Sequence, residues 1–158
     1  MSRIRCAAVS VAACATIVAV GASAAAAKTV TMHFFSKPAY QRISDPSGKL
    51  VKPPAVPGAG DRLSFAGNDY AGNHTHHAKQ ATASDHVVCT LTSPGTALCD
   101  GTFAIGGSMI IGDDFVLNLS SKITTVKITG GTGLYRHAHG TVVAKTVGPN
   151  TDFTIKLR

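Results

Sequence analysis

The stretch ITGGTGLYRHAHGTVVAKT, residues 128–146, decides the fold more than any other part of the chain. It begins at the end of an alternating segment, 123–128, and runs into 134–147, the longest β-strand that the sequence predicts. Between them stand Gly130, Gly131 and Gly133, which permit positive φ angles or a close approach of two backbones. Since no helical pattern follows to complete a phosphate site, the glycines predict a corner between two strands.

Outward from this corner, the chain repeats short alternating segments separated by turn residues. Strands are expected at 28–36, 62–66, 80–91, 97–105, 123–128, 134–147 and 152–157, with a further hairpin, 108–111 and 115–120, turning at Gly112-Asp113-Asp114. Residues 36–60 are rich in proline and predict a long loop, because proline donates no ladder hydrogen bond. Roughly eight strands without a capped helix predict one all-β domain, a sandwich or a closed antiparallel barrel.

The first 27 residues have the pattern of a secretory signal peptide. Arg3 and Arg5 precede a run of apolar or small residues, and several Ala-x-Ala cleavage choices follow. Two alternatives are a membrane anchor, for which the apolar run is short, and lipidation at Cys14, after which no polar tether follows. We therefore expect cleavage near Ala26 or Ala27, a secreted domain of residues 28–158, and no stable membrane anchor.

Charge and composition argue against a nucleic-acid-binding protein. The 158 residues include 15 Lys and Arg against 8 acidic residues, all of them Asp, for a formal net charge of +7. The lysines are scattered and do not alternate with aromatic residues, so the charge favours solubility and weak affinity for anionic surfaces. The absence of Glu removes that residue type from every proposed mechanism.

Two cysteines remain after the predicted leader, Cys89 and Cys99. Between them, Ser93-Pro94-Gly95 is a turn signal flanked by strand-forming residues. If Thr92 faces Thr96, Cys89 lies opposite Cys99, within reach of a disulfide bond. An oxidising compartment favours this bond, and a metal site would require more ligands at closer spacing.

The most conspicuous polar cluster is Asn73-His74-Thr75-His76-His77. Imidazole is a good zinc ligand, but the cluster lies in a turn-rich stretch without Cys or Glu. We interpret it as a solvated loop, with adventitious metal binding as the alternative. No metal site and no cofactor are therefore expected.

The stretch 128–146 resembles plant dirigent proteins and their bacterial relatives, whose pattern is Gly-Gly-Thr-Gly-x-aromatic-Arg-x-Ala-x-Gly. The segment GDRLSF, residues 60–65, is similar to allene oxide cyclases. The resemblance covers residues 61–158 and implies an eight-stranded antiparallel β-barrel with a central apolar cavity. It also implies homo-oligomers, since the plant members form trimers.

The functional residues of these two families are not retained intact. The first strand carries Phe34 where dirigent proteins often have Asp, and the cyclase Asn falls on Gly67. The cyclase cysteine matches Cys89, and the dirigent arginine before the last motif glycine is His139. Whether the chain is an enzyme therefore stays open.

Alternation along 134–147 places Tyr135, His137 and His139 on one strand face. The resemblance implies that this face looks into the barrel, with Phe65 and Phe34 adding apolar wall. These five residues are the ligand-binding candidates, and His139 and Tyr135 are weak candidates for proton transfer. The leading hypothesis is a secreted barrel that binds an apolar or phenolic small molecule. The alternatives are a dirigent- or cyclase-type enzyme acting on a reactive ligand, and an extracellular structural or interaction protein.

Overall fold

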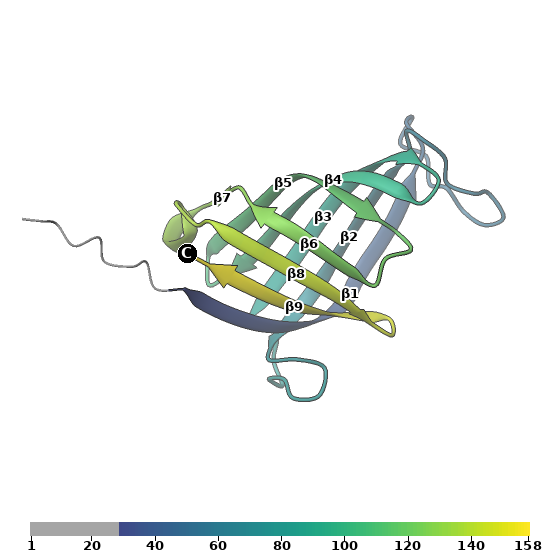
Figure 1. Ribbon diagram of the computed structural model, residues 1–158. Coiled ribbons are helices and arrows are strands. Elements are labelled where there is room, and N and C mark those ends of the chain that lie inside the picture. The colour runs from purple at the N-terminus through teal and green to yellow at the C-terminus, as the bar shows by residue number, and fades with distance from the viewer. Residues whose placement is uncertain (1–28) are drawn as a thin grey trace, which may run out of the picture.

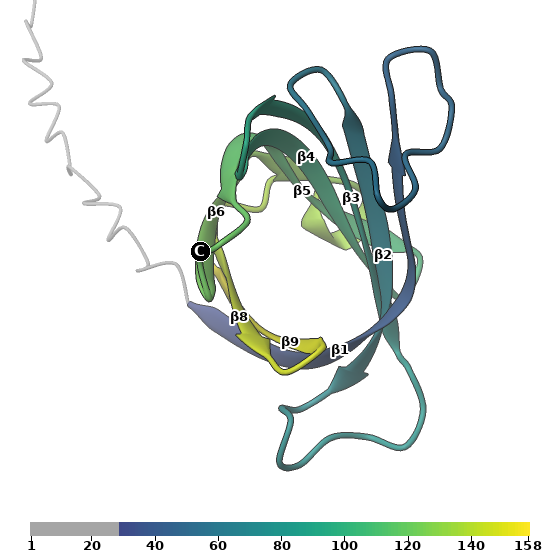
Figure 2. The same ribbon diagram turned by 90° about the vertical axis from the view of Figure 1, so that its right-hand side faces the viewer.

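The computed structural model describes residues 29–158, which form one antiparallel sheet curled into a nearly closed barrel (Figure 1). In the view of Figure 2 the strands form a ring. The elements are β1 (Val30–Ser44), β2 (Arg62–Ala71), β3 (Ala83–Ser93), β4 (Thr96–Ile105), β5 (Ser108–Asn118), β6 (Ile123–Ile128), β7 (Gly130–Gly131), the 3-10 turn η1 (Gly133–Tyr135), β8 (Gly140–Val147) and β9 (Asn150–Leu157). Their order around the sheet is β6-β8-β9-β1-β2-β3-β4-β5-β7. The predicted all-β barrel is confirmed, with nine described strands instead of eight because two-residue β7 forms its own short ladder.

The ring closes where β5 meets the segment after β6. The backbone N–H of Thr129 donates to the carbonyl of Ile111 at 2.9 Å, and that of Thr132 donates to the carbonyl of Met109 at 2.8 Å. Beyond Gly112 the pairing of β5 with β4 shifts register, and Asp114 has a φ of 54°. Gly112-Asp113-Asp114 is therefore a bulge inside β5, and the predicted hairpin turn at this place is wrong. The turn instead lies at Gly106-Gly107, whose φ angles of 55° and 80° suit a tight hairpin.

The first two strands are longer than predicted. β1 continues through Pro38 to Ser44, and β2 continues past Ala66 to Ala71. A register shift between Pro38 and Tyr40 accommodates the proline, which is a place where a strand tolerates one. The predicted loop 36–60 is therefore wrong at its start, and the connection begins after Ser44.

The predicted strand 134–147 is wrong in its first half. After the glycine corner the chain forms η1, and the N–H of Ala138 donates to the carbonyl of Tyr135 at 2.9 Å. The strand begins only at Gly140, which has a φ of 145° and no room for a Cβ beside the carbonyl of Lys156. Because alternation holds only within a strand, the shared face of Tyr135, His137 and His139 does not exist.

The disulfide prediction is confirmed. Cys89 pairs with Cys99 in the β3–β4 ladder, and their sulfur atoms are bonded. The predicted signal peptide lies outside the described residues. Within residues 29–158, no helix has the length and apolarity to cross a membrane.

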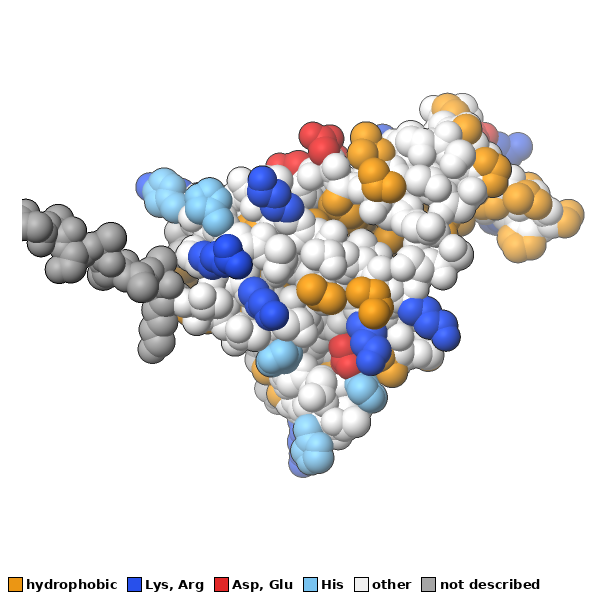
Figure 3. All heavy atoms as spheres, in the orientation of Figure 1, with side chains coloured by type: hydrophobic (Ala, Val, Ile, Leu, Met, Phe, Trp, Pro, Cys, Tyr) orange, Lys and Arg blue, Asp and Glu red, His pale blue; other side chains and the backbone are white. Residues whose placement is uncertain are grey.

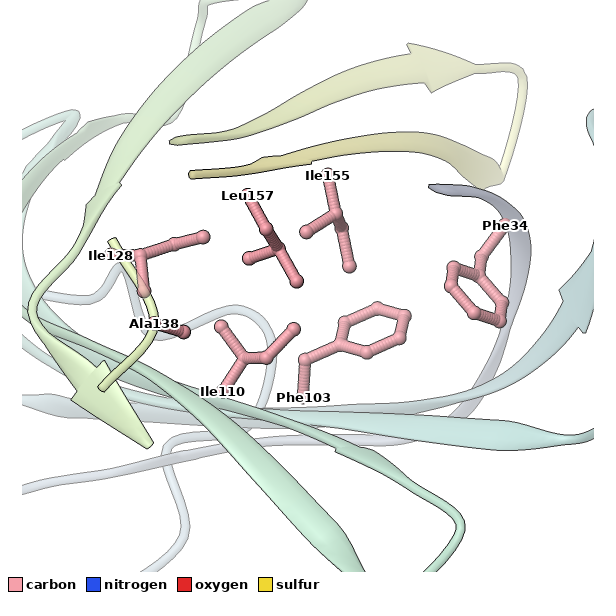
Figure 4. Close-up of a cluster of buried hydrophobic side chains, with 7 residues drawn as sticks. All are labelled: Phe34, Phe103, Ile110, Ile128, Ala138, Ile155 and Leu157. Carbon is pink, nitrogen blue, oxygen red and sulfur yellow. The ribbon is translucent and has the colours of Figure 1, made fainter. Parts of the chain in front are cut away.

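Two apolar clusters fill different parts of the barrel. One lies at the end that carries η1, where side chains from several strands converge (Figure 4): Phe34, Phe103, Ile110, Ile128, Ala138, Ile155 and Leu157. The other surrounds the disulfide and contains Leu63, Leu91 and Ala97. The first cluster closes one end of the barrel, and the space between the two is the candidate site.

Candidate functional site

A cavity of about 350 Å³ lies inside the barrel. Its wall is mainly apolar and receives side chains from most strands, among them Leu63, Phe65, Val87, Phe103, Phe115, Val126, Val142 and Phe153. Asn118, Leu119 and Ser121 from the β5–β6 connection and Pro149 from the β8–β9 turn also contribute to it. These turns lie at the barrel end opposite η1, so the cavity opens there and is blind at the end filled by the first cluster.

Three buried polar side chains lie at or directly behind the inner wall of this cavity, on three neighbouring strands. Ser36 of β1 pairs directly with Asp69 of β2, and Asp85 of β3 pairs with Gly67 of β2. Ser36 is 5% exposed, Asp85 6% and Asp69 0%. The Ser36 hydroxyl donates a hydrogen bond of 2.8 Å to Asp85 Oδ1. Ser36, Gly67 and Asp85 line the cavity, while Asp69 is buried behind them.

Glycine at position 67 makes this cluster possible. A Cβ there would overlap both the Ser36 hydroxyl and the Asp85 carboxyl. The missing side chain is thus the space through which Asp85 reaches across β2 to Ser36. Position 67 is where the resemblance to the cyclases places Asn, so the site differs from theirs at this point.

Within the described residues, the cavity wall beside the two carboxyl groups carries no Lys, Arg or His side chain. Within the described part of the chain, neither carboxyl oxygen of Asp69 accepts a hydrogen bond. Burial, and secondly the nearby Asp85 carboxylate, raise the pKa of Asp69 to about 8. Burial also raises the pKa of Asp85, although hydrogen bonding from Ser36 works in the opposite direction. Asp69, buried behind the inner wall of the cavity, is therefore expected to keep its proton at neutral pH.

The predicted ligand-binding residues fall in different places. Phe65 lies on the cavity wall, whereas Phe34 packs against Phe103 in the cluster beside it, with ring centroids 5.0 Å apart. Tyr135 is half-buried, and its hydroxyl faces the sulfur of Met32 at 4.0 Å. His137 and His139 are exposed and do not line the cavity. The prediction that His139 faces the interior is wrong, because η1 and the following turn hold it outside.

Tyr135 and His137 instead border a second, more open hollow at the closed end of the barrel. Arg136 and Arg158 share its rim, and Val30 and Leu157 form part of its base. This hollow is separated from the cavity by the first apolar cluster.

Two histidines of the 74–77 segment contact different strands of the barrel. The imidazole of His74 pairs with the Asp152 carboxyl on β9, and His77 stacks on Phe35 with ring centroids 4.8 Å apart. Their segment thereby covers part of the outer face of β1. In the described residues, no three ligating side chains gather closely enough to hold a metal ion.

Basic side chains are spread over the face of the molecule seen in Figure 3, which includes the outer face of β6, β8 and β9. Lys127, Lys145 and Lys156 contribute to it and are exposed. They pair across the sheet with Thr or Asp residues: Lys127 and Lys156 with Thr141, and Lys145 with Asp152. This scattered arrangement agrees with the sequence-based interpretation of a solvated basic surface.

Sequence analysis did not find Asp69 and Asp85. Gly67, Asn68 and Asp69 were expected in a turn, although Leu63, Phe65, Gly67 and Asp69 follow strand alternation without a break. In the same way, Asp85 shares alternation with Val87, Cys89 and Leu91, which are apolar. The signal in the sequence was therefore an acidic residue, in each of these two strands, at a position that alternation turns toward the barrel interior.

Comparisons with known proteins identify the fold. No protein-family model matches the chain, and no curated protein matches its sequence. Among solved structures, pyocyanin demethylase is similar, with 22% identity and a TM-score of 0.61 over 82% of this chain and 100% of that one. The pterocarpan synthase dirigent protein PsPTS1 is similar at 17% identity and a TM-score of 0.56, over 83% of this chain and 94% of its own. A second, GePTS1, has 17% identity and a TM-score of 0.55 over 82% and 83% of the two chains.

These three proteins share the β-barrel arrangement with the chain, and at 17–22% identity the likeness shows the fold alone. The resemblance read from the stretch 128–146 is therefore confirmed for the architecture, and the chain has the dirigent-like β-barrel fold.

Proposed function

We propose that the chain is a secreted barrel that binds an apolar or phenolic small molecule in its central cavity. The observation that carries this proposal is the cavity itself, about 350 Å³ in volume and lined mainly by apolar and aromatic side chains. Pockets of this size and lining suit small organic ligands. The few polar groups at the inner end would orient such a ligand, as polar groups do in most small-molecule sites.

The names of the similar structures support the same class of partner. Pyocyanin demethylase and the pterocarpan synthase dirigent protein are named for the small molecules pyocyanin and pterocarpan, and both proteins have this barrel. The homo-oligomer implied by the resemblance, a trimer among plant members, is part of the proposal, and native mass determination tests it.

The cavity can be tested with two matched substitutions on β6. Thr124 lines the cavity, whereas its neighbour Thr125 faces outward and is exposed. Thr124→Phe should narrow the cavity by projecting an aromatic ring into it, and should weaken binding of the fluorescent probe N-phenyl-1-naphthylamine by at least about tenfold, because the ring and the probe would compete for the same space. Thr125→Phe should bind the probe like the wild type. Equal binding by both variants would contradict the proposal.

Export is a separate part of the proposal and rests on the leader pattern and the disulfide. Protein recovered outside the producing cells should begin between Ala25 and Lys28 when its intact mass is measured. A start at Cys14 with added acyl mass would show a lipoprotein instead.

The second candidate function is an enzyme of dirigent or cyclase type in the same cavity. The observation that favours it is the carboxyl pair of Asp69 and Asp85, because a buried carboxyl group with a raised pKa is suited to general acid–base catalysis. Turnover that disappears in Asp85→Asn while ligand binding persists would favour this alternative. An interaction protein with a merely filled barrel is the remaining alternative, and probe binding inside the barrel excludes it.

A further inference from the structure

We propose that Asp69 and Asp85 share a single proton and form the recognition site of the cavity, which takes ligands bearing a hydroxyl group and rejects ligands bearing a carboxylate. This inference rests on the proposed small-molecule function and specifies the chemistry of its ligand. Both carboxyl groups lie on the inward faces of adjacent strands, at positions two residues apart in register.

Within the described residues, the wall of the cavity carries no positively charged side chain. None of the residues that line the cavity, all within 29–158, is Lys, Arg or His. Two buried carboxylates at close range repel each other and are both poorly solvated, so one of them retains a proton. The Asp69 pKa of about 8 agrees with this conclusion.

The hydrogen bonds indicate which of the two carboxyl groups carries the proton and which one is ionised. Asp85 accepts a hydrogen bond from the Ser36 hydroxyl, and this bond favours the ionised form of the Asp85 carboxyl. Asp69 is fully buried, and in the described residues its carboxyl oxygens have no hydrogen-bond partner, because the nearby Ser36 hydroxyl donates to Asp85. The Asp69 carboxyl is therefore the better place for the proton. In this arrangement Asp69 is the neutral acid and Asp85 the carboxylate.

The location of Asp85 on the cavity wall gives the pair its specificity. A ligand hydroxyl can donate to the Asp85 carboxylate, whereas a ligand carboxylate would place a second negative charge beside it. Like charges brought together in this way disfavour binding. The site therefore fits phenols and alcohols and disfavours organic acids of the same shape.

The histidine, lysine and aspartate side chains that surround the pair lie on the outer faces of β1, β3 and β9. His86 of β3 acts on Asp85 from outside the barrel, where its ring contacts Tyr40 of β1. On β1, His33 and Lys37 are exposed, and on β9 Asp152 pairs with His74. Asp85 is thus the carboxyl group that faces the ligand, with Asp69 behind it, and Tyr40 is the other titratable side chain on the cavity wall.

The experiment compares 2-naphthol with 2-naphthoate as competitors of N-phenyl-1-naphthylamine at pH 7. The wild type should bind 2-naphthol at least about tenfold more tightly, a difference of about 1.4 kcal/mol. Asp85→Asn should lose this preference, because an amide can donate to a carboxylate. Asp113→Asn removes the same charge from an exposed outer position and should keep the preference. Unchanged selectivity in Asp85→Asn would overturn the inference.

A second measurement does not depend on any ligand. In the full chain labelled with ¹³C at the aspartate carboxyls, one carboxyl should titrate near pH 8, and this titration should vanish in Asp69→Asn. If every carboxyl titrates below about pH 5, the shared proton is absent and the inference fails even if the probe binds. If the probe does not bind the wild type while the pH 8 titration is present, the proposed function fails, and the recognition role fails with it.

Discussion

Asp69→Asn should remove a large pH dependence from the stability of the barrel. The pKa of Asp69 is about 8 in the folded protein and near 3.8 in an ordinary exposed setting. Between these values the folded protein keeps a proton that the unfolded chain releases, so the free energy of unfolding falls as pH rises. Wild-type stability should therefore fall by about 3–6 kcal/mol between pH 4 and pH 8.

The measurement is urea unfolding of both proteins across this pH range, without reducing agent. The two proteins should differ least near pH 4, and the Asn variant should be the more stable one at pH 8. Since other groups also titrate, the informative quantity is the difference between the two curves. Asp113→Asn serves as the control for an exposed carboxyl. A constant difference between wild type and Asp69→Asn at all pH values would contradict the account.

Phe103→Ala is the second change with a large expected effect. Phe103 is 4% exposed, and its ring lies between those of Phe34 and Phe153, with centroid distances of 5.0 and 5.4 Å. Removing a buried aromatic ring loses its transfer free energy and its contacts with both partners, which together cost about 3–5 kcal/mol. The same change should enlarge the cavity, since Phe103 is part of its wall.

Met109→Ala is the matched control, because Met109 lies on the neighbouring strand, faces outward and is 38% exposed. It should cost less than about 1 kcal/mol in the same unfolding measurement. A loss of similar size in both variants would mean that the first apolar cluster does not hold the closed end of the barrel.

Much of the barrel could be predicted from the sequence, because turn chemistry and alternation are local. The segment 123–128 and the opposed pair Cys89 and Cys99 were predicted at the correct places. The errors arose where tertiary pairing overrides local signals. Pro38 sits inside a strand because a register shift removes the need for its N–H, and Gly112 lies in a bulge because β4 continues to pair on both sides of it.

The site was harder to predict than the fold. The alternation of Tyr135, His137 and His139 looked like a strand, but the turn from Thr132 to Ala138 interrupts it and leaves both histidines exposed. Conversely, Asp69 appeared to be a turn residue, because Asn and Asp beside Gly are common in turns. Its burial follows from the length of β2, which depends on pairing with β1 and β3.

The central claim, that a small molecule binds inside the barrel, is tested most directly by nuclear Overhauser contacts between bound 2-naphthol and valine methyl groups of the labelled protein. Val142 and Val126 line the cavity, whereas Val143 is the outward neighbour of Val142 and Val116 is 64% exposed. The account predicts contacts from the ligand to the methyls of Val142 and Val126. Contacts confined to Val143 and Val116 would place the ligand on the outer surface and contradict it.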